Sequence, residues 1–221
     1  MKLEGLKINF LGDSITEGHG TSNIENTYWN ILKKEEGLCE ARGYGIGGTR
    51  IAKKRIPSEN PRWDLDFIGR YPEMDNDADV VVVFGGTNDF GHGDAELGKM
   101  SDRTPYTFYG ACHTLFEGLL NKYPNSTIVI MTPLHRVFED DIRGGHDKKD
   151  GEGLGTLLTY VNIIKEVAAY YSLPLLDLWS VSGIQPNVHS IREKYCPDGL
   201  HPNDEGHKLI ASRLAGFLNT L

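Results

Sequence analysis

Short apolar runs and longer amphipathic stretches alternate along this chain. Five apolar runs predict strands, at residues 6–11, 38–42, 78–86, 126–133 and 173–178. The third run contains four valines followed by a phenylalanine, which indicates a strand buried on both faces. Strands of this kind occur in parallel sheets that are covered by helices.

The stretches between these runs carry apolar residues at helical spacing. They predict helices at residues 26–35, 104–124, 157–171 and 204–219. Asn203 is well placed to cap the last helix. Strands that alternate with helices predict a doubly wound α/β sandwich, with the strand order 2-1-3-4-5 as the working hypothesis.

Length and composition predict one domain over residues 1–221. A chain of 221 residues, of which 39% are hydrophobic, can bury one sizeable core. Two long stretches, 53–77 and 134–154, show no regular pattern. The second is too long for a simple connection, and it is interpreted as a substrate-side loop or lid, with disorder as the alternative.

Charge and cysteine content narrow the classes of partner and compartment. The net charge of −8 argues against nucleic acid as the main partner. No apolar run reaches 18 residues, so no membrane-spanning helix is expected. Cys39, Cys112 and Cys196 are odd in number and lack a C-x-x-C spacing, which favours free thiols in the cytoplasm. A signal peptide that had been removed would leave no trace here.

Polar residues follow the predicted strands at the points where ligands bind in open α/β sheets. Gly12-Asp13-Ser14 follows the first strand, GYGIGGTR (43–50) the second and GGTNDFGHG (85–93) the third. In the order 2-1-3-4-5 these three loops are neighbours. CPDGLHPNDEG (196–206), which contains Asp198 and His201, precedes the last helix.

These residue types are the ones that acyl transfer needs. Ser14 can act as nucleophile and His201 as its base, while Asp198, three residues earlier, can orient the imidazole. The amides of Ser14 and Gly48 and the side chain of Asn88 can donate to an oxyanion.

The four blocks, in this order, resemble the GDSL, or SGNH, hydrolase superfamily. The resemblance runs from residue 8 to about residue 213. It implies a three-layer α/β/α sandwich, a serine nucleophile at Ser14, an Asp-x-x-His pair at Asp198 and His201, and Asn88 as a donor. It also implies a glycine donor at Gly48, with Gly47 as the alternative. The chain departs from the family at Gly43, where members usually carry an asparagine.

Each candidate residue also has a structural interpretation. Ser14 could be only a helix cap, His201 a surface histidine, and Asn88 with Asp89 a turn. Asp13 is expected to fix the serine loop through local hydrogen bonds. Asp13 is also a candidate for the substrate pocket. The two other pocket candidates lie in the long stretches, although packing or solvation explains them equally well: Trp63 and Arg136.

Two other patterns in the chain are interpreted as coincidental. Gly43, Gly45 and Gly48 spell G-x-G-x-x-G, but they follow the second strand and no clear long helix comes next. The histidines that could indicate a metal show no recognisable ligand spacing: His92, His135 and His146. No metal or other cofactor is therefore expected.

The sequence thus predicts a serine esterase that cleaves a small-molecule ester with a short acyl group. An O-acetyl group on a carbohydrate is the first hypothesis, partly because family members often act on such groups. A thioesterase or an arylesterase would use the same residues. Alternatives from other classes are a non-catalytic carbohydrate-binding module on the same fold and a nucleotide-dependent oxidoreductase.

Overall fold

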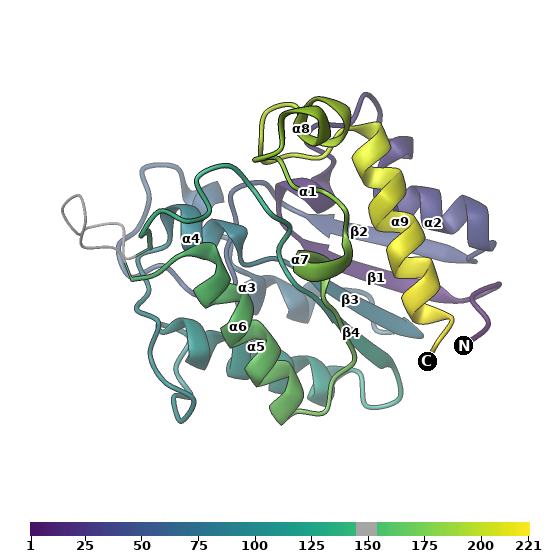
Figure 1. Ribbon diagram of the computed structural model, residues 1–221. Coiled ribbons are helices and arrows are strands. Elements are labelled where there is room, and N and C mark those ends of the chain that lie inside the picture. Colours follow the sequence, from purple (N-terminus) through teal and green to yellow (C-terminus); the bar gives the residue numbers. More distant parts are fainter. Residues whose placement is uncertain (145–153) are drawn as a thin grey trace.

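A five-stranded parallel sheet in the order β2-β1-β3-β4-β5 forms the centre of the molecule (Figure 1). The computed structural model describes residues 1–144 and 154–221. The strands are β1 Lys7–Gly12, β2 Glu40–Gly45, β3 Val80–Phe84, β4 Thr127–Met131 and β5 Leu175–Leu176. This order confirms the one predicted from the sequence.

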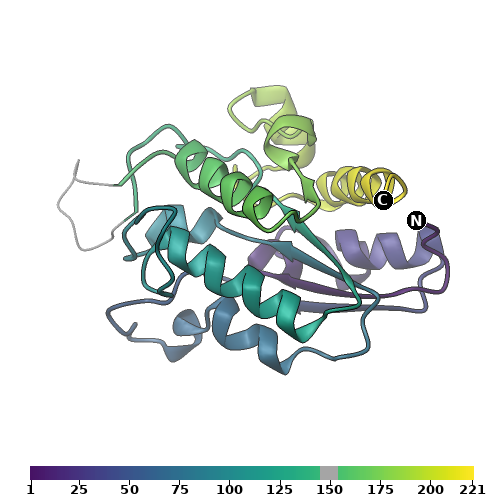
Figure 2. The same cartoon turned by 90° about the horizontal axis from the view of Figure 1, so that it is seen from below.

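Long helices cover both faces of the sheet (Figures 1 and 2). One face packs against α2 (Tyr28–Glu36) and α9 (Asp204–Leu218), and the other against α5 (Phe108–Lys122) and α6 (Leu157–Tyr170). Successive residues of β3 point to opposite faces, so that Val81 belongs to the core beneath α5 and α6 while Val82 belongs to the core beneath α2 and α9. The predicted three-layer α/β/α sandwich is confirmed.

Short helices connect these elements at places where the sequence shows no period. They are α1 (Ser14–Glu17), η1 (Ile24–Asn26), η2 (Pro61–Asp64), α3 (Phe67–Arg70), η3 (Tyr71–Glu73), α4 (Thr87–His92), α7 (Leu178–Val181) and α8 (His189–Tyr195). The stretch 53–77, expected to be irregular, contains three of them. Side chains of Asn60 and Asp66 cap η2 and α3, so local capping rather than periodicity forms these turns.

The second strand differs from its prediction at residues 38–42. It spans Glu40–Gly45, and therefore includes two glycines that were assigned to the following loop. A Cβ atom at Gly43 would overlap the indole of Trp29, and one at Gly45 would overlap the backbone of Thr16 and Glu17. These glycines let Trp29 and α1 pack directly on the edge strand.

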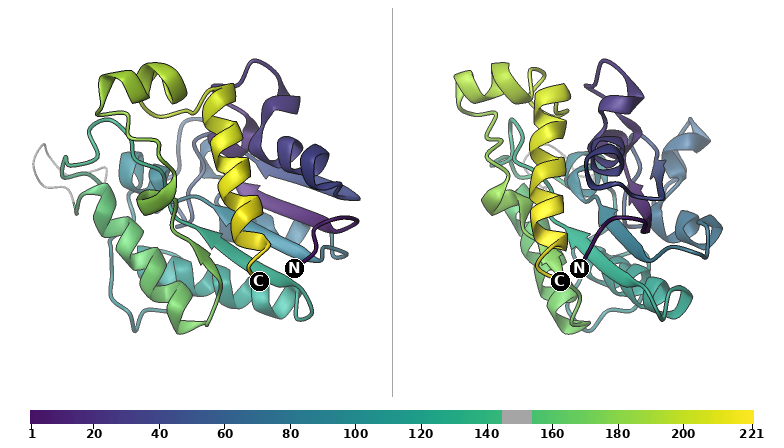
Figure 3. Two further views of the ribbon diagram at one scale, coloured as in Figure 1. Left: turned by 45° about the vertical axis from the view of Figure 1, so that its right-hand side comes forward. Right: turned by 90° about the vertical axis from the view of Figure 1, so that its right-hand side faces the viewer.

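The two ends of the chain lie side by side. The ammonium group of Met1 donates to the carbonyl of Leu218 at 3.1 Å. Both views in Figure 3 place the termini at one end of the molecule and α8 at the other. The carboxyl ends of the strands point toward the α8 end, because the loop from β1 leads there into α1.

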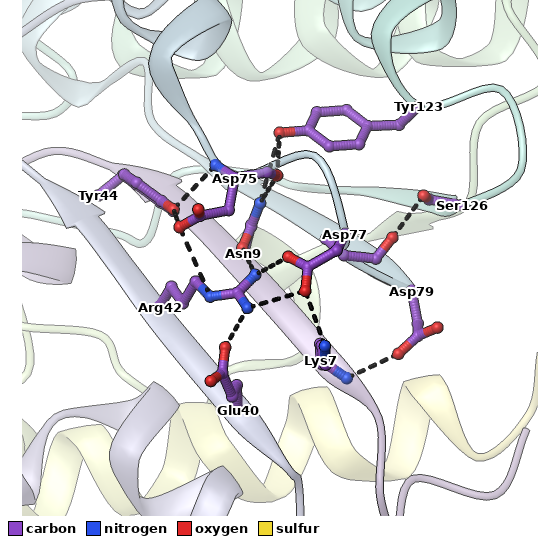
Figure 4. A network of polar contacts seen from close by, with 11 residues as sticks. Lys7, Asn9, Glu40, Arg42, Tyr44, Asp75, Asp77, Asp79, Tyr123 and Ser126 are labelled. Atoms are coloured by element: carbon purple, nitrogen blue, oxygen red, sulfur yellow. Dashed lines mark hydrogen bonds and ion pairs between the residues drawn. The ribbon is translucent and has the colours of Figure 1, made fainter.

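A charged network occupies the amino end of the sheet (Figure 4). Lys7 and Arg42 each donate to the carboxylate of Asp77 at 2.7 Å. Tyr44 donates to Asp75 at 2.7 Å. The network therefore ties β1 and β2 to the segment that leads into β3.

Two further findings concern the part of the chain that the structure describes. No helix there is long and apolar enough to cross a membrane. All three cysteines are free thiols, with Cys112 and Cys196 buried and Cys39 exposed.

Candidate active site

Ser14 begins the short helix that follows the first strand. Asp13, and not Ser14, is the N-cap of α1, and its Oδ1 accepts the amide of Ile15 at 3.0 Å. The interpretation of Ser14 as a helix cap is therefore wrong, while the local role expected for Asp13 is observed. Burial raises the pKa of Asp13 to about 7, although the Ile15 amide and the charge of Arg70 counteract it.

Ser14, His201 and Asp198 form a continuous line of hydrogen bonds. The Oγ of Ser14 lies 3.0 Å from Nε2 of His201, and Nδ1 of the same ring lies 2.7 Å from Oδ2 of Asp198. The other oxygen of Asp198 accepts the amides of His201 and Leu200 at 2.7 and 2.8 Å. Burial alone would raise the pKa of Asp198, but these hydrogen bonds outweigh it and hold the pKa below its usual range.

Asn88 lies in the first turn of α4, directly after β3. Its Nδ2 donates one hydrogen to the carbonyl of Thr49 at 2.9 Å, which leaves the second amide hydrogen for another acceptor. The next residue, Asp89, accepts the amides of Ile51 and Ala52 at 2.9 Å each. The α4 segment thus holds the loop that follows β2 at two adjacent points.

The two glycine amides that could bind an oxyanion differ in their partners. The amide of Gly47 donates to Oε2 of Glu17 at 2.6 Å, so it is occupied. Gly48 has φ +76, a left-handed conformation that favours glycine, and its amide has no hydrogen-bond partner among the described residues. This difference supports Gly48 over Gly47 as the donor.

Arg70 supports the site, and sequence reasoning missed it. Its guanidinium donates to the carbonyls of Tyr44 and Gly12 at 2.7 and 2.9 Å and to Oγ1 of Thr49 at 2.9 Å. These bonds join the carboxyl ends of β1 and β2 to the following loop. Burial lowers the pKa of Arg70 to about 10, against the opposing charge of Asp13. No sequence signal singles out this arginine, since its role depends on contacts distant in sequence.

Trp63 and Arg136, two of the predicted pocket residues, contact different segments of the site. Trp63 is half exposed, and its indole Cδ1 lies 3.5 Å from where a Cβ of Gly48 would stand. Arg136 donates to Oγ1 of Thr87 at 3.2 Å and lies 5.6 Å from the centre of the Phe90 ring. Arg136 is therefore packed against α4 and is not a freely solvated side chain.

The long loop expected over 134–154 is described only in part. Its first half runs beside the His201 segment, where the amide of Val137 donates to the carbonyl of Gly199 at 2.9 Å. Residues 145–153, and with them the interpretation of the loop as a lid, lie outside the described part of the chain.

The histidines considered as metal ligands have other partners. Nδ1 of His92 lies 3.2 Å from Nη1 of Arg50, and Nδ1 of His135 lies 3.0 Å from the carboxylate of Glu139. His146 lies outside the described residues. Within residues 1–144 and 154–221, no group of three or more His, Cys, Asp or Glu side chains could hold a metal ion.

Comparison with known families agrees with this geometry. The model of the GDSL-like Lipase/Acylhydrolase family matches residues 10–209, which include all four sequence blocks. The chain belongs to this family. It is accordingly a hydrolase that acts on carboxylic ester bonds, which excludes the interpretation as a nucleotide-dependent oxidoreductase.

Relatives of this GDSL hydrolase span almost its whole length. A GDSL lipase of Mycobacterium tuberculosis is 25% identical over 215 residues, covering 95% of this chain and 80% of that protein. A crystal structure of a protein from Lactobacillus plantarum is 29% identical with a TM-score of 0.81, covering 98% of both chains. The structure of an acetyl xylan esterase, 23% identical, has a TM-score of 0.62 and shares the fold over 96% of this chain and 98% of that one.

Proposed function

We propose that this GDSL hydrolase is a serine esterase that removes a short acyl group, most simply acetyl, from a carbohydrate. The observation that carries the proposal is the line from Ser14 through His201 to Asp198, with spacings of 3.0 and 2.7 Å. A hydroxyl, an imidazole and a carboxylate in this order are the parts of a serine-based acyl transfer.

In the proposed mechanism the proton of the Ser14 hydroxyl passes to Nε2 of His201 while Oγ attacks the ester carbonyl. Asp198 accepts a hydrogen bond from Nδ1–H of His201 and stabilises the imidazolium. The oxyanion accepts hydrogen bonds from the backbone amides of Ser14 and Gly48 and from the second side-chain N–H of Asn88. His201 then gives its proton to the departing alcohol oxygen. Water releases the acyl group from Ser14 by the same path in reverse.

The surroundings of Gly48 support a polar alcohol as the larger part of the substrate. A cavity of about 670 Å³ lies beside Gly48, and polar side chains such as Arg50, Lys54 and Glu59 line it together with the indole of Trp63. This lining favours a sugar over a long hydrocarbon chain. One solved structure of the same fold is an acetyl xylan esterase, which agrees with this proposal.

The first test is hydrolysis of p-nitrophenyl acetate by the wild type and by Ser14→Ala. We expect the variant to lose at least about 10³-fold in kcat. Ser101→Ala, which changes an exposed serine far from the nucleophile in sequence, is the matched control and should keep full activity. Equal rates for the wild type and Ser14→Ala would show that Ser14 is not the nucleophile.

The second test identifies the kind of ester. Release of acetate from acetylated xylose and mannose oligosaccharides is measured beside hydrolysis of p-nitrophenyl butyrate and an acetyl thioester. Faster release from the sugars supports a carbohydrate deacetylase. Preference for the thioester, or for phenyl esters alone, would instead support the thioesterase or arylesterase alternatives. Binding of the sugars without turnover by the wild type would support a binding module.

A further inference from the structure

Apart from Gly48, the cavity beside this glycine is formed by residues that take no part in the proposed reaction. Its lining comes from the loop after β2, from η2 and from the end of α4: Gly48, Arg50, Lys54, Pro57, Ser58, Glu59, Trp63 and His92. With about 670 Å³, it is within the size range of pockets for small organic ligands. An acetyl group needs only a small part of this volume, so the alcohol part of the ester is the occupant that the cavity fits.

Arg50 places a buried cation in the wall of this cavity. Its side chain is 2% exposed, and it donates to the carbonyl of Trp63 at 2.6 Å and contacts Nδ1 of His92 at 3.2 Å. Its Nε is buried without a hydrogen-bond partner among the described residues. The guanidinium forms no ion pair within 4 Å among the described residues. The charge of Arg50 acts on the buried carboxylate of Asp89, but the oxygens of Asp89 accept the backbone amides of Ile51 and Ala52.

Lys54 adds a second cation on the same side. Its Nζ donates to Oγ of Ser58 at 2.8 Å, and it forms no ion pair with any carboxylate that the structure describes. The two carboxylates closest in sequence do not contact its ammonium group directly, although the charges of Lys54 and Arg50 both act on Asp64 and contribute to its lowered pKa. Glu59 lines the cavity but is exposed, and both oxygens of Asp64 accept the amide of Ser58, at 2.9 and 3.1 Å. Among the residues that line the cavity, two cations, Arg50 and Lys54, therefore stand beside one carboxylate, that of the exposed Glu59.

We propose that this cavity binds an alcohol that carries an anionic group, namely an acidic sugar such as an O-acetylated uronic acid. The inference deepens the proposed function and rests on it. The sugar ring lies against the exposed indole of Trp63, next to the oxyanion donor Gly48. The carboxylate of the sugar binds near Arg50 and Lys54 and supplies the direct ion-pair partner that neither cation has among the described residues. A neutral sugar would offer these two cations no direct ion pair.

The kinetic test uses two substrates that differ in one charge. These are a mono-O-acetylated methyl glucuronoside and the corresponding uronamide, in which a neutral amide replaces the carboxylate. We expect the wild type to favour the carboxylate by about tenfold in kcat/KM at low ionic strength, and this preference to shrink in 0.5 M salt. Equal kcat/KM values for the two substrates would overturn the inference.

Two lysine variants localise the effect. Lys54→Gln should reduce the preference for the carboxylate to about threefold or less, since it removes one of the two cations. Lys53→Gln removes the same charge one residue away, outside the lining of this cavity, and should keep the preference. If both variants lost the preference for the carboxylate to the same extent, the effect would come from the overall charge of the loop. That result would contradict the assigned site.

A binding experiment keeps the inference independent of turnover. Ser14→Ala protein is titrated with methyl glucuronoside, glucose 6-phosphate and methyl glucoside, and the change in tryptophan fluorescence is followed. Trp63→Phe identifies the signal that arises from the cavity. Tighter binding of the carboxylate than of the neutral sugar supports the site even if no ester is hydrolysed. Tighter binding of the phosphate would reassign the ligand, and equal binding of all three would overturn the inference.

Discussion

Asn88 divides its hydrogen-bonding capacity between the fold and the proposed chemistry. One amide hydrogen binds the Thr49 carbonyl at 2.9 Å and fixes the orientation of the side chain, so that the other hydrogen points in a defined direction. A donor that is oriented before the substrate arrives needs no reorganisation when charge develops on the oxyanion.

Replacement of Asn88 should therefore act on turnover more than on binding. We expect Asn88→Ala to lower kcat on p-nitrophenyl acetate by about 10²–10³-fold with a small change in KM. Asn121→Ala, at an exposed position of α5, is the matched control. An unchanged kcat in Asn88→Ala, with the fold intact by thermal melting, would show that this residue is not an oxyanion donor.

Single residues were predictable where strand ends bring sequence blocks together. The carboxyl ends of β1 and β3 adjoin, so Ser14 and Asn88 were expected in the same crevice, and their segments are there. Arg70 and Glu17 could not be found in this way. Their contacts reach across loops, and neither residue lies in a block of recognisable spacing.

At the scale of elements, Glu17 joins three segments. It lies on α1, its Oε2 accepts the amide of Gly47 at 2.6 Å, and its other oxygen binds Arg62 of η2. His19 lies 3.2 Å from the same carboxylate and is also 5.4 Å from the ring centre of His201. The carboxylate of Glu17 therefore joins the helix that begins with Ser14 to the loop that presents Gly48, in addition to the bonds of Arg70.

Two substitutions separate the hydrogen bond of Glu17 from its charge. Glu17→Gln keeps an acceptor for the Gly47 amide, whereas Glu17→Ala removes it and frees the loop. We expect kcat to fall on the order of tenfold in Glu17→Ala and by clearly less in Glu17→Gln, because small displacements of a donor are costly. Glu25→Ala, an exposed acidic residue of η1, is the control. Equal losses in both Glu17 variants would assign the effect to charge.

The long elements were predictable because their burial follows a regular period. The helix predicted at residues 104–124 is α5, and apolar residues at helical spacing are buried in it: Phe108, Ala111, Cys112, Leu115 and Leu119. The edge strand β2 was displaced by two residues at its start and three at its end. Its extent depends on pairing with β1 and on the close approach of Trp29, and neither of these is visible in a local pattern.

At the scale of the whole molecule, the two ends of the sheet differ in character. The carboxyl end holds Ser14, His201 and Asn88, while the amino end holds the network around Asp77 (Figure 4). Hydrogen bonds from Lys7 and Arg42 lower the pKa of Asp77 to about 2. Because the folded pKa lies below the usual value of 3.8, ionised Asp77 stabilises the fold above pH 4, and this contribution is lost as the pH falls toward 2.

Asp77→Asn should consequently affect stability and leave the chemistry intact. We expect a small fall in Tm at pH 7, because exposed ion pairs contribute little, and a smaller difference from the wild type at pH 3. Hydrolysis of p-nitrophenyl acetate should be unchanged. Asp140→Asn, at an exposed position without a described partner, is the control. A Tm difference that stays constant from pH 7 to pH 3 would contradict the assigned pKa.

The direct packing of α1 on β2 also limits which positions of this protein tolerate amino-acid substitution. Gly45 leaves no room for a side chain beneath the helix that begins with Ser14, so any replacement there displaces the nucleophile. In a library of all single substitutions selected for activity, Gly45 should be as intolerant as Ser14 itself. Lys54 and Ser58, by contrast, bond to each other in the wall of the cavity, so substitutions at these two positions alter the cavity while the frame around Ser14 is inherited unchanged.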